Sequence, residues 1–599
     1  MSDDERTYDE LGEPADERPG PSSVERQLGQ YVTKKYGEQA KSLAPRFAPM
    51  PDPGEDPDES GVWSRINFHL KPEELVAYLD QYIVRQDEAK AVLATKICTH
   101  FNRARYLAGR DQSDPADGVG LIKNNVLMIG PTGVGKTYMV KLIAAKLGVP
   151  FVKGDATKFS ETGYVGGDVE DLIRELVHEA DDDIELAQYG IVYIDEVDKI
   201  ASTPNLIGPD VSRTGVQRNL LKPMEETEVD LKVAHDPISQ IQAIEKYRKT
   251  GKRERRTVNT RHILFIMSGA FNELAEVIKR RLNQGAMGFG GKVADPGGDL
   301  EYIKQLTALD LVEFGFENEF VGRLPITVVL DDLDADDLLE ILKNPNNPVI
   351  VSKKRDFAAY GIDLRFEESA LRVLADQAAT MSTGARALVS VVEKALLPFE
   401  TRLPSTEIKR LLVTLELVAD PAAALERLLE DPAGDVDAER FEQAGWQERL
   451  RLLQMVAQRQ SLYTDRLGGE LTPARMDLVA DEYYRCGMSL GTAFERVIER
   501  LTQLREIEYD FLETTGIRIT FGETAEVAML AGAAASKASP HEYWARISQD
   551  LEHGLRLVAD RTGINEFLLP EQAILDTAGY LEDVVQTHLA GLPPETRMA

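Results

Sequence analysis

The chain has 599 residues, which is long enough for roughly four domains of about 150 residues each. Its formal net charge of −32 disfavours a general nucleic-acid binder, because such proteins neutralise phosphates with Lys and Arg. With only two cysteines, Cys98 and Cys486, a four-cysteine zinc site is excluded and a disulfide framework is disfavoured. The N-terminus lacks an apolar leader and no stretch approaches about 18 consecutive apolar residues, so we expect a cytosolic protein without membrane association.

The first 62 residues are rich in proline and acidic residues and show little apolar periodicity. Such a segment buries too little apolar surface to offset the entropy of ordering, so we expect residues 1–62 to be mostly disordered. Apolar residues at helical spacing begin near Lys71 and lead into the first core strand.

A glycine-rich loop follows the apolar run 125–129 and opens a helical stretch. Glycines at this position allow backbone N–H groups to surround phosphate oxygens, the lysine reaches the outer phosphates, and the following hydroxyl can ligate Mg²⁺. The sequence therefore predicts a phosphate loop that binds a nucleoside triphosphate, made of Gly130, Pro131, Thr132, Gly133, Val134, Gly135, Lys136 and Thr137.

A second apolar run, 191–194, ends in two adjacent carboxylates, Asp195 and Glu196. A parallel strand would bring them to the edge of the sheet where the phosphates lie. We expect Asp195 to join Thr137 in holding Mg²⁺ and Glu196 to polarise the attacking water, since phosphoryl transfer depends on positioning and charge stabilisation. The pair of motifs predicts an ATPase.

Strand and helix patterns alternate through residues 63–332, which predicts an α/β large domain with a parallel sheet covered by helices on both faces. The expected core elements are strand 125–129, helix 136–147, strand 150–153, helix 168–180, strand 191–194, helix 214–225, strand 262–267, helix 271–282 and strand 326–330. A smaller α+β domain is expected at 333–418, with helices 334–342, 349–359, 367–380 and 385–400 and strands 362–366 and 408–417. Residues 419–599 are predicted to form a mainly helical extension.

The extension contains a short internal match to the small domain. Residues 361–370 align with 516–525 at a constant offset, and Ala378 and Ala379 fall on Ala533 and Ala534. We interpret this as a degenerate copy of part of the small domain, with chance agreement as the alternative.

The region from about Leu70 to Asp420 resembles the ClpX family, hexameric AAA+ unfoldases that feed proteins to the ClpP peptidase. Six separate motifs carry the resemblance: Leu79–Gln86, Gly163–Gly166, Glu185–Lys199, Asp210–Gln217, Glu319–Pro325 and Thr383–Arg386. The cysteines of the family's zinc-binding N-terminal domain do not occur in this sequence, so we do not expect that domain. The segment 156–160 is more similar to the related unfoldase HslU. The resemblance implies an AAA+ large domain, an AAA+ lid domain and a homohexamer.

The resemblance also implies roles for individual residues. Arg323 matches the arginine that reaches the γ-phosphate bound by a neighbouring subunit, and Arg386 matches the arginine that senses nucleotide within its own subunit. Ile83 and Val84 would contact the adenine. Arg85 stands where a glycine is usual in the family, which leaves the geometry on the purine side open.

Two further matches concern macromolecular partners. Tyr164 and Val165, flanked by glycines, match the loop that grips substrate polypeptide in the axial pore, and residues 213–217 match a second pore loop. Met287, Gly288 and Phe289 fall where the family carries the tripeptide that docks on ClpP; a Gly-rich loop with one stray phenylalanine is the alternative. A basic run at 246–256 falls where the family has a loop at the pore entrance, and it would attract acidic tails or be a solvated loop.

These observations favour a Mg²⁺- and ATP-dependent unfoldase that threads unfolded or tagged proteins through a hexameric pore and delivers them to a ClpP-type peptidase. One alternative is a ring that remodels particular protein complexes without a peptidase, with residues 419–599 selecting the substrate. Another is a nucleotide-switched scaffold that works through the extension. A nucleic-acid partner is not expected.

Overall fold

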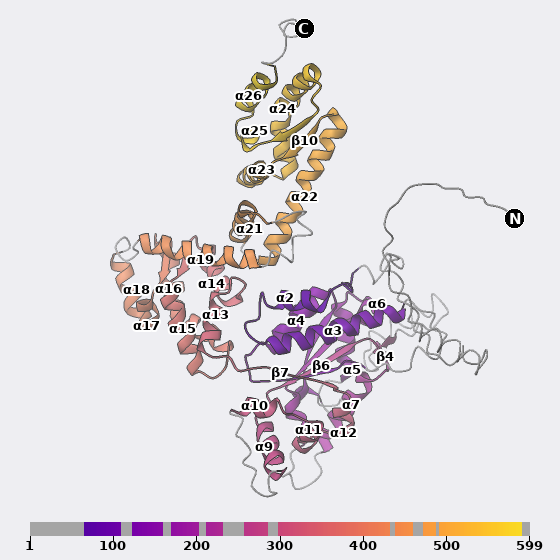
Figure 1. The fold of residues 1–599 in the computed structure, drawn as a ribbon. Helices are drawn as coiled ribbons and strands as arrows, with labels where there is room; N and C mark the ends of the chain where they lie inside the picture. Colours follow the sequence, from indigo (N-terminus) through magenta and orange to yellow (C-terminus); the bar gives the residue numbers. More distant parts are fainter. Residues whose placement is uncertain are drawn as a thin grey trace, which may run out of the picture. The chain divides into compact units, whose positions relative to one another are not determined.

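The fold is taken from a computed structural model, which describes residues 65–108, 123–159, 169–202, 211–231, 257–285, 298–431, 438–458, 471–486 and 490–589 (Figure 1). Four features discussed above lie outside the described residues. These are the acidic segment 1–62, the loop with Tyr164 and Val165, the basic run 246–256 and the segment with Met287, Gly288 and Phe289.

The large domain is built on a five-stranded parallel sheet with the strand order β2-β3-β6-β1-β7. Its strands are β1 (Val126–Ile129), β2 (Phe151–Asp155), β3 (Ile191–Asp195), β6 (Leu264–Gly269) and β7 (Ile326–Val329). Residues of β1 alternate between two hydrophobic clusters, with Leu127 and Ile129 in one and Val126 and Met128 in the other. Both faces of the sheet are therefore buried, which is why the three central strands β3, β6 and β1 are nearly continuous apolar runs, whereas the edge strands β2 and β7 include exposed residues.

Helices cover both faces (Figure 1). One cluster contains α2 (Pro72–Leu79), α3 (Asp87–Ala108) and α4 (Lys136–Leu147). The other contains α5 (Val169–Glu179), α6 (Ile184–Ala187), α7 (Val211–Met224), α9 (Leu274–Gly285), α10 (Asp299–Ile303), α11 (Ala308–Phe314) and α12 (Asn318–Gly322). A short antiparallel pair, β4 (Glu228–Asp230) and β5 (Thr257–Asn259), follows α7. The predicted α/β architecture with helices on both faces is confirmed.

The small domain has its own hydrophobic cluster. Its elements are α13 (Ala335–Lys343), α14 (Pro348–Ala359), β8 (Asp363–Phe366), α15 (Glu368–Thr380), α16 (Arg386–Arg402), β9 (Arg410–Val413), α17 (Leu415–Ala419) and α18 (Pro421–Glu430). The expected strand 408–417 was too long. Thr414 ends the strand because its side chain accepts a hydrogen bond from the Leu417 N–H and caps α17.

The C-terminal extension packs around a further cluster. It consists of α19 (Ala438–Gln458), α21 (Pro473–Cys486), α22 (Leu490–Thr515), β10 (Arg518–Phe521), α23 (Glu523–Ala535), α24 (Pro540–Thr562), β11 (Glu566–Leu569), α25 (Glu571–Leu575) and α26 (Thr577–Leu589). From α21 onward the order of helices and strands is the same as from α13 to α18, and in both units the two strands pair in parallel. Across the described residues, we find no helix with the length and apolar character that spanning a membrane requires.

Candidate nucleotide-binding site

A cavity of about 490 Å³ lies at the carboxyl edge of the sheet, between the large and small domains. Its lining includes most of the predicted nucleotide residues: Ile83, Val84, Thr132, Gly133, Val134, Gly135, Lys136, Thr137, Asp195, Glu196 and Arg386. Gly130 and Pro131, the first two residues of the phosphate loop, follow β1 directly. Residues distant in sequence thus surround one space large enough for a nucleotide.

Two glycines give the loop its shape. Gly133 and Gly135 have φ angles of +84° and +98°, a region that residues with a side chain rarely adopt. A Cβ atom on Gly133 would lie 2.1 Å from the carbonyl oxygen of Thr383 in the small domain. The Ala385 N–H also donates a hydrogen bond of 3.0 Å to the Gly133 carbonyl. The phosphate loop is therefore in direct backbone contact with the small domain.

Lys136 is the first residue of α4, and its ammonium donates to the carbonyl oxygens of Gly130 and Pro131 at 2.6 and 2.8 Å. Burial lowers the pKa of this ammonium below its usual value, while the Asp195 and Asp198 carboxylates oppose the shift. These two hydrogen bonds hold the Lys136 ammonium against the phosphate loop, where phosphates would bind.

Thr137 and Asp195, the expected metal ligands, are joined by a chain of hydroxyl groups. Thr137 donates to the Tyr193 hydroxyl at 3.0 Å, and Ser268 donates to Asp195 Oδ1 at 2.6 Å. The Ser268 hydroxyl has one proton and donates it to the Asp195 carboxylate. In the 2.6 Å contact between Tyr193 and Ser268, the tyrosine hydroxyl is therefore the donor. Hydroxyl and carboxylate oxygens beside a phosphate loop are a donor set that fits Mg²⁺.

Asp195 is kept ionised by two neighbours. Burial raises the pKa of its carboxyl, but the Ser268 hydrogen bond and the Lys153 ammonium, 3.0 Å from Oδ2, outweigh burial and leave the pKa below its usual value. A carboxyl whose pKa is lower in the folded than in the unfolded chain stabilises the fold at pH values above its unfolded-state pKa. This contribution is lost as the pH falls through its folded-state pKa. Because a carboxyl with a lowered pKa also stays ionised to lower pH, we expect ATPase activity to fall only under acidic conditions.

We expect Ser268→Ala to raise the pKa of Asp195, because the carboxylate loses a hydrogen-bond donor. The acid limb of the ATPase pH profile should then move to higher pH, as measured by steady-state turnover across acidic buffers. Tyr193→Phe is the matched control, since it removes a hydroxyl from the chain but leaves the Ser268–Asp195 bond. An acid limb that moves equally in both variants, or in neither, would contradict this assignment.

Glu196 follows β3 and has a left-handed backbone with a φ of +58°. This conformation is uncommon for a residue with a side chain, and such strain often occurs at functional sites. The carboxylate is exposed and lines the cavity, so its position suits the activation of water.

Ile83 and Val84 both line the cavity, and Arg85 follows them on the same loop. Arg85 keeps a φ of +59°, the backbone region that favours glycine. Its guanidinium pairs with Asp337 at 2.7 Å and Asp334 at 3.4 Å at the start of α13. The arginine therefore links the purine-side loop to the small domain.

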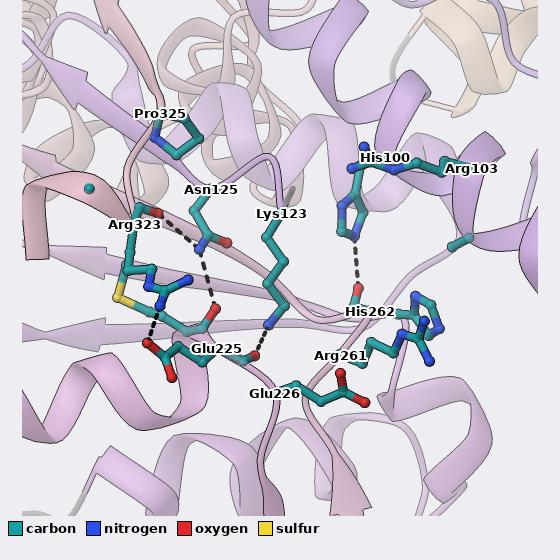
Figure 2. Close-up of a pocket in the computed structure, with 13 residues that line it drawn as sticks. His100, Arg103, Lys123, Asn125, Glu225, Glu226, Arg261, His262, Arg323 and Pro325 are labelled. Atoms are coloured by element: carbon teal, nitrogen blue, oxygen red, sulfur yellow. Dashed lines mark hydrogen bonds and ion pairs between the residues drawn. The ribbon is translucent and has the colours of Figure 1, made fainter. Parts of the chain in front are cut away.

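Arg323 does not line this cavity; it lines a separate one (Figure 2). It follows α12, and its carbonyl accepts a hydrogen bond of 3.1 Å from Asn125, the residue before β1. The phosphate loop begins at Gly130, at the other end of β1. At about 3.3 Å per strand residue, this corresponds to a separation of roughly 16 Å. The structure brings Arg386 to the nucleotide cavity of its own chain, but it does not bring Arg323 there.

Several residues at the site were not identified from the sequence. Ser268, Tyr193 and Lys153 surround Asp195, and Asn272 lines the cavity just beyond β6. The available signal was the position of Ser268 and Asn272 after the apolar run of β6, since the carboxyl ends of parallel strands meet at one edge. Nothing comparable in the sequence marks Lys153.

The comparison with known proteins agrees with this geometry. Residues 122–327 match the family model for the AAA domain (Cdc48 subfamily), and residues 333–404 match that for the C-terminal, D2-small domain, of ClpB protein. The ATP-dependent Clp protease ATP-binding subunits ClpX of Borrelia duttonii (strain Ly) and Borrelia recurrentis (strain A1) are each 40% identical to the chain over 351 residues. These matches cover 58% of this chain and 78% of each relative. The chain belongs to the ClpX family.

ClpX family membership makes the chain an ATP-binding AAA+ ATPase of the Clp chaperone class. The two family models end at residues 327 and 404, so neither extends to the C-terminal extension that begins with α19. The predicted resemblance and the predicted ATPase activity are confirmed.

Proposed function

We propose that the chain forms a homohexameric ring that uses Mg²⁺ and ATP to unfold polypeptides and thread them through a central pore, delivering them to a ClpP-type peptidase. The observation that carries the ring is the location of Arg323. Because Arg323 lies near the amino end of β1 and the phosphate loop lies at the carboxyl end, Arg323 would contact a nucleotide held by a neighbouring subunit. A catalytic arginine used in this way requires an assembly.

Each nucleotide contact has an assigned role in this proposal. Lys136 and the loop amides bind the phosphates, Thr137 and Asp195 hold Mg²⁺, and Glu196 orients the water. Arg386 contacts the nucleotide from the small domain, which would couple nucleotide state to the angle between the two domains.

Tyr164→Ala tests the threading step. The proposed pore tyrosine grips substrate but has no part in the chemistry, so ATP turnover should persist while unfolding of a tagged, folded substrate slows at least about tenfold. Loss of substrate fluorescence and release of phosphate, measured together, would separate the two effects. Unfolding at the wild-type rate would contradict the role of Tyr164 in threading.

A ring that remodels protein complexes without a peptidase is the alternative within the same class. Adding a ClpP-type peptidase to the assay distinguishes the two. Under the delivery proposal, Phe289→Ala keeps unfolding but loses degradation, whereas a remodeller shows no degradation even before the substitution. Degradation that survives Phe289→Ala would contradict docking through Met287, Gly288 and Phe289.

We further infer that residues 471–589 are a second copy of the small domain. The support comes from positions with unusual backbones, since Gly361 and Gly516 both have a φ of +73°, and Ser382 and Lys537 have φ values of +52° and +51°. Both pairs are separated by the same number of residues, 361 to 516 and 382 to 537. At that offset Arg386 corresponds to His541, so this copy lacks the nucleotide-sensing arginine.

Arg386→Ala and His541→Ala form a matched test of that difference. The first should lower ATP turnover by about a hundredfold, because it removes a cation from the nucleotide cavity. The second should leave turnover unchanged, since His541 lies beside Glu506 in the extension. A large loss of turnover in His541→Ala would show that the second copy takes part in nucleotide handling.

A further inference from the structure

Arg323 is held by a carboxylate of its own subunit. Its guanidinium lies 2.5 Å from Glu225, the residue that follows α7 (Figure 2). The two side chains are 51% and 46% exposed, so the pair lies at the surface and is open to a partner. It belongs to a cavity of about 500 Å³ that is separate from the nucleotide cavity of the same chain.

The segment that enters β1 holds Arg323 and Glu225 next to each other. Asn125, which is buried, donates to the carbonyl oxygens of Arg323 at 3.1 Å and Met224 at 3.5 Å. The Lys123 ammonium donates to the carbonyl of Glu225 at 2.6 Å (Figure 2) and to that of Thr260 at 2.6 Å. The segment entering β1 thus ties the end of α7 to the segment that carries the arginine. Their proximity therefore rests on hydrogen bonds from the Asn125 and Lys123 side chains to backbone carbonyls.

A second set of contacts joins α7 to the turn before α12. The Gln217 side chain accepts a hydrogen bond of 2.8 Å from the Glu317 N–H and donates one of 2.8 Å to the Ile200 carbonyl. Arg218 pairs with the Glu317 carboxylate at 2.8 Å. Ile200 ends the short helix that follows Glu196. The segment from Glu317 to Arg323 therefore contacts α7 at one of its ends and Glu225, just after α7, at the other. Helix α7 also contacts the chain just beyond Glu196, the proposed catalytic carboxylate.

The ion pair sets a condition on catalysis. A guanidinium bound to Glu225 must leave it, at least in part, before it can neutralise charge on a phosphate of the neighbouring subunit. An exposed ion pair of this kind shifts such an equilibrium by no more than about fivefold. A Mg²⁺-bound triphosphate carries more charge than one carboxylate, so it can displace Glu225.

We propose that Glu225 is a positioning residue that retains Arg323 on its own subunit until the nucleotide of the neighbouring subunit replaces it. The proposal rests on the role of Arg323 between subunits given above. Glu225 thereby keeps the arginine at the protein surface, and the transfer of the guanidinium to the phosphate becomes a reversible exchange of one anionic partner for another.

Mixed rings test this exchange. Glu196→Gln chains supply Arg323 but do not hydrolyse ATP, whereas Arg323→Ala chains keep Glu196 but supply no arginine. Mixing the two full-length variants should restore ATP turnover at sites where one chain's arginine faces the other chain's nucleotide. Adding Glu225→Gln to the arginine donor should raise this restored turnover about two- to fivefold at subsaturating ATP. Adding it to the Arg323→Ala chain should not change it.

The position dependence separates positioning from a structural role, because a folding defect would appear in either chain. Glu226→Gln, at the adjacent cavity-lining carboxylate, is the matched control and should not raise turnover in either chain. Unchanged or reduced turnover with Glu225→Gln in the donor, or an equal rise in the acceptor, would overturn the proposal while leaving the role of Arg323 intact. Failure of the parent variants to restore turnover would contradict the role of Arg323 between subunits, and the Glu225 proposal with it.

Discussion

Glu196→Gln will lower ATP turnover by about a thousandfold while ATP binding is retained. The carboxylate lines the nucleotide cavity, and an amide of the same shape cannot accept a proton from water. The phosphate loop, Lys136 and Thr137 are untouched, so the affinity for nucleotide should change little. Phosphate release at saturating ATP and equilibrium binding of a fluorescent ATP analogue measure the two quantities.

Glu185→Gln is a suitable control for this variant. Glu185 is an exposed carboxylate on α6, close in sequence to β3, and it does not line the cavity. Its replacement should leave turnover within about twofold, as expected for an exposed side chain away from the site. Brisk hydrolysis by Glu196→Gln would remove Glu196 from the role of water-orienting residue.

Arg323→Ala should produce a loss of similar size, about three orders of magnitude in turnover, through a different subunit. The arginine lies at the amino edge of the sheet, so its own nucleotide cavity should bind ATP normally. The defect should appear in the maximal rate and should persist at saturating ATP. Steady-state kinetics over a range of ATP concentrations would reveal this pattern.

Arg261→Ala is the matched control, because Arg261 lines the same cavity as Arg323. It should lower turnover by less than about tenfold, since screened surface charges contribute little. An equal loss in both variants would mean that the positive charge of this surface matters and that no single arginine performs the catalysis. Normal turnover in Arg323→Ala would remove the strongest support for a ring.

The nucleotide loop and the sheet were predictable because their signals are local. Four or five buried residues in a row, followed by glycines or carboxylates, fix both the strand and what lies at its end. The strand order is not local. β6 lies between β3 and β1, and only this arrangement brings Ser268 within 2.6 Å of Asp195. A sequence pattern carries no information on which strands become neighbours, so the hydroxyl chain could not be predicted.

The placement of arginines shows the same limit. Arg323 and Arg386 were both assigned to nucleotide from the resemblance, but periodicity cannot tell which edge of the sheet each one occupies. The position of Arg323 depends on the Asn125 side chain, which donates to a carbonyl 198 residues further along the chain and also to that of Met224. No sequence pattern marks Glu225, because its role depends on Arg323, which the Asn125 hydrogen bonds place beside it.

The backbone conformation of Arg85 and its ion pairs couple the stability of the purine-side loop to that of α13. A side chain in the left-handed region costs roughly 1 to 2 kcal/mol relative to glycine, and each exposed ion pair to Asp334 or Asp337 returns about 0.2 to 1 kcal/mol. The arginine and the aspartates are therefore interdependent. Loss of either aspartate would leave one ion pair fewer to offset the backbone cost at Arg85, and it would also weaken the start of α13, where Asp334 and Asp337 form a capping box. Glycine at position 85 would remove the backbone cost but would leave the two aspartates to cap the helix alone.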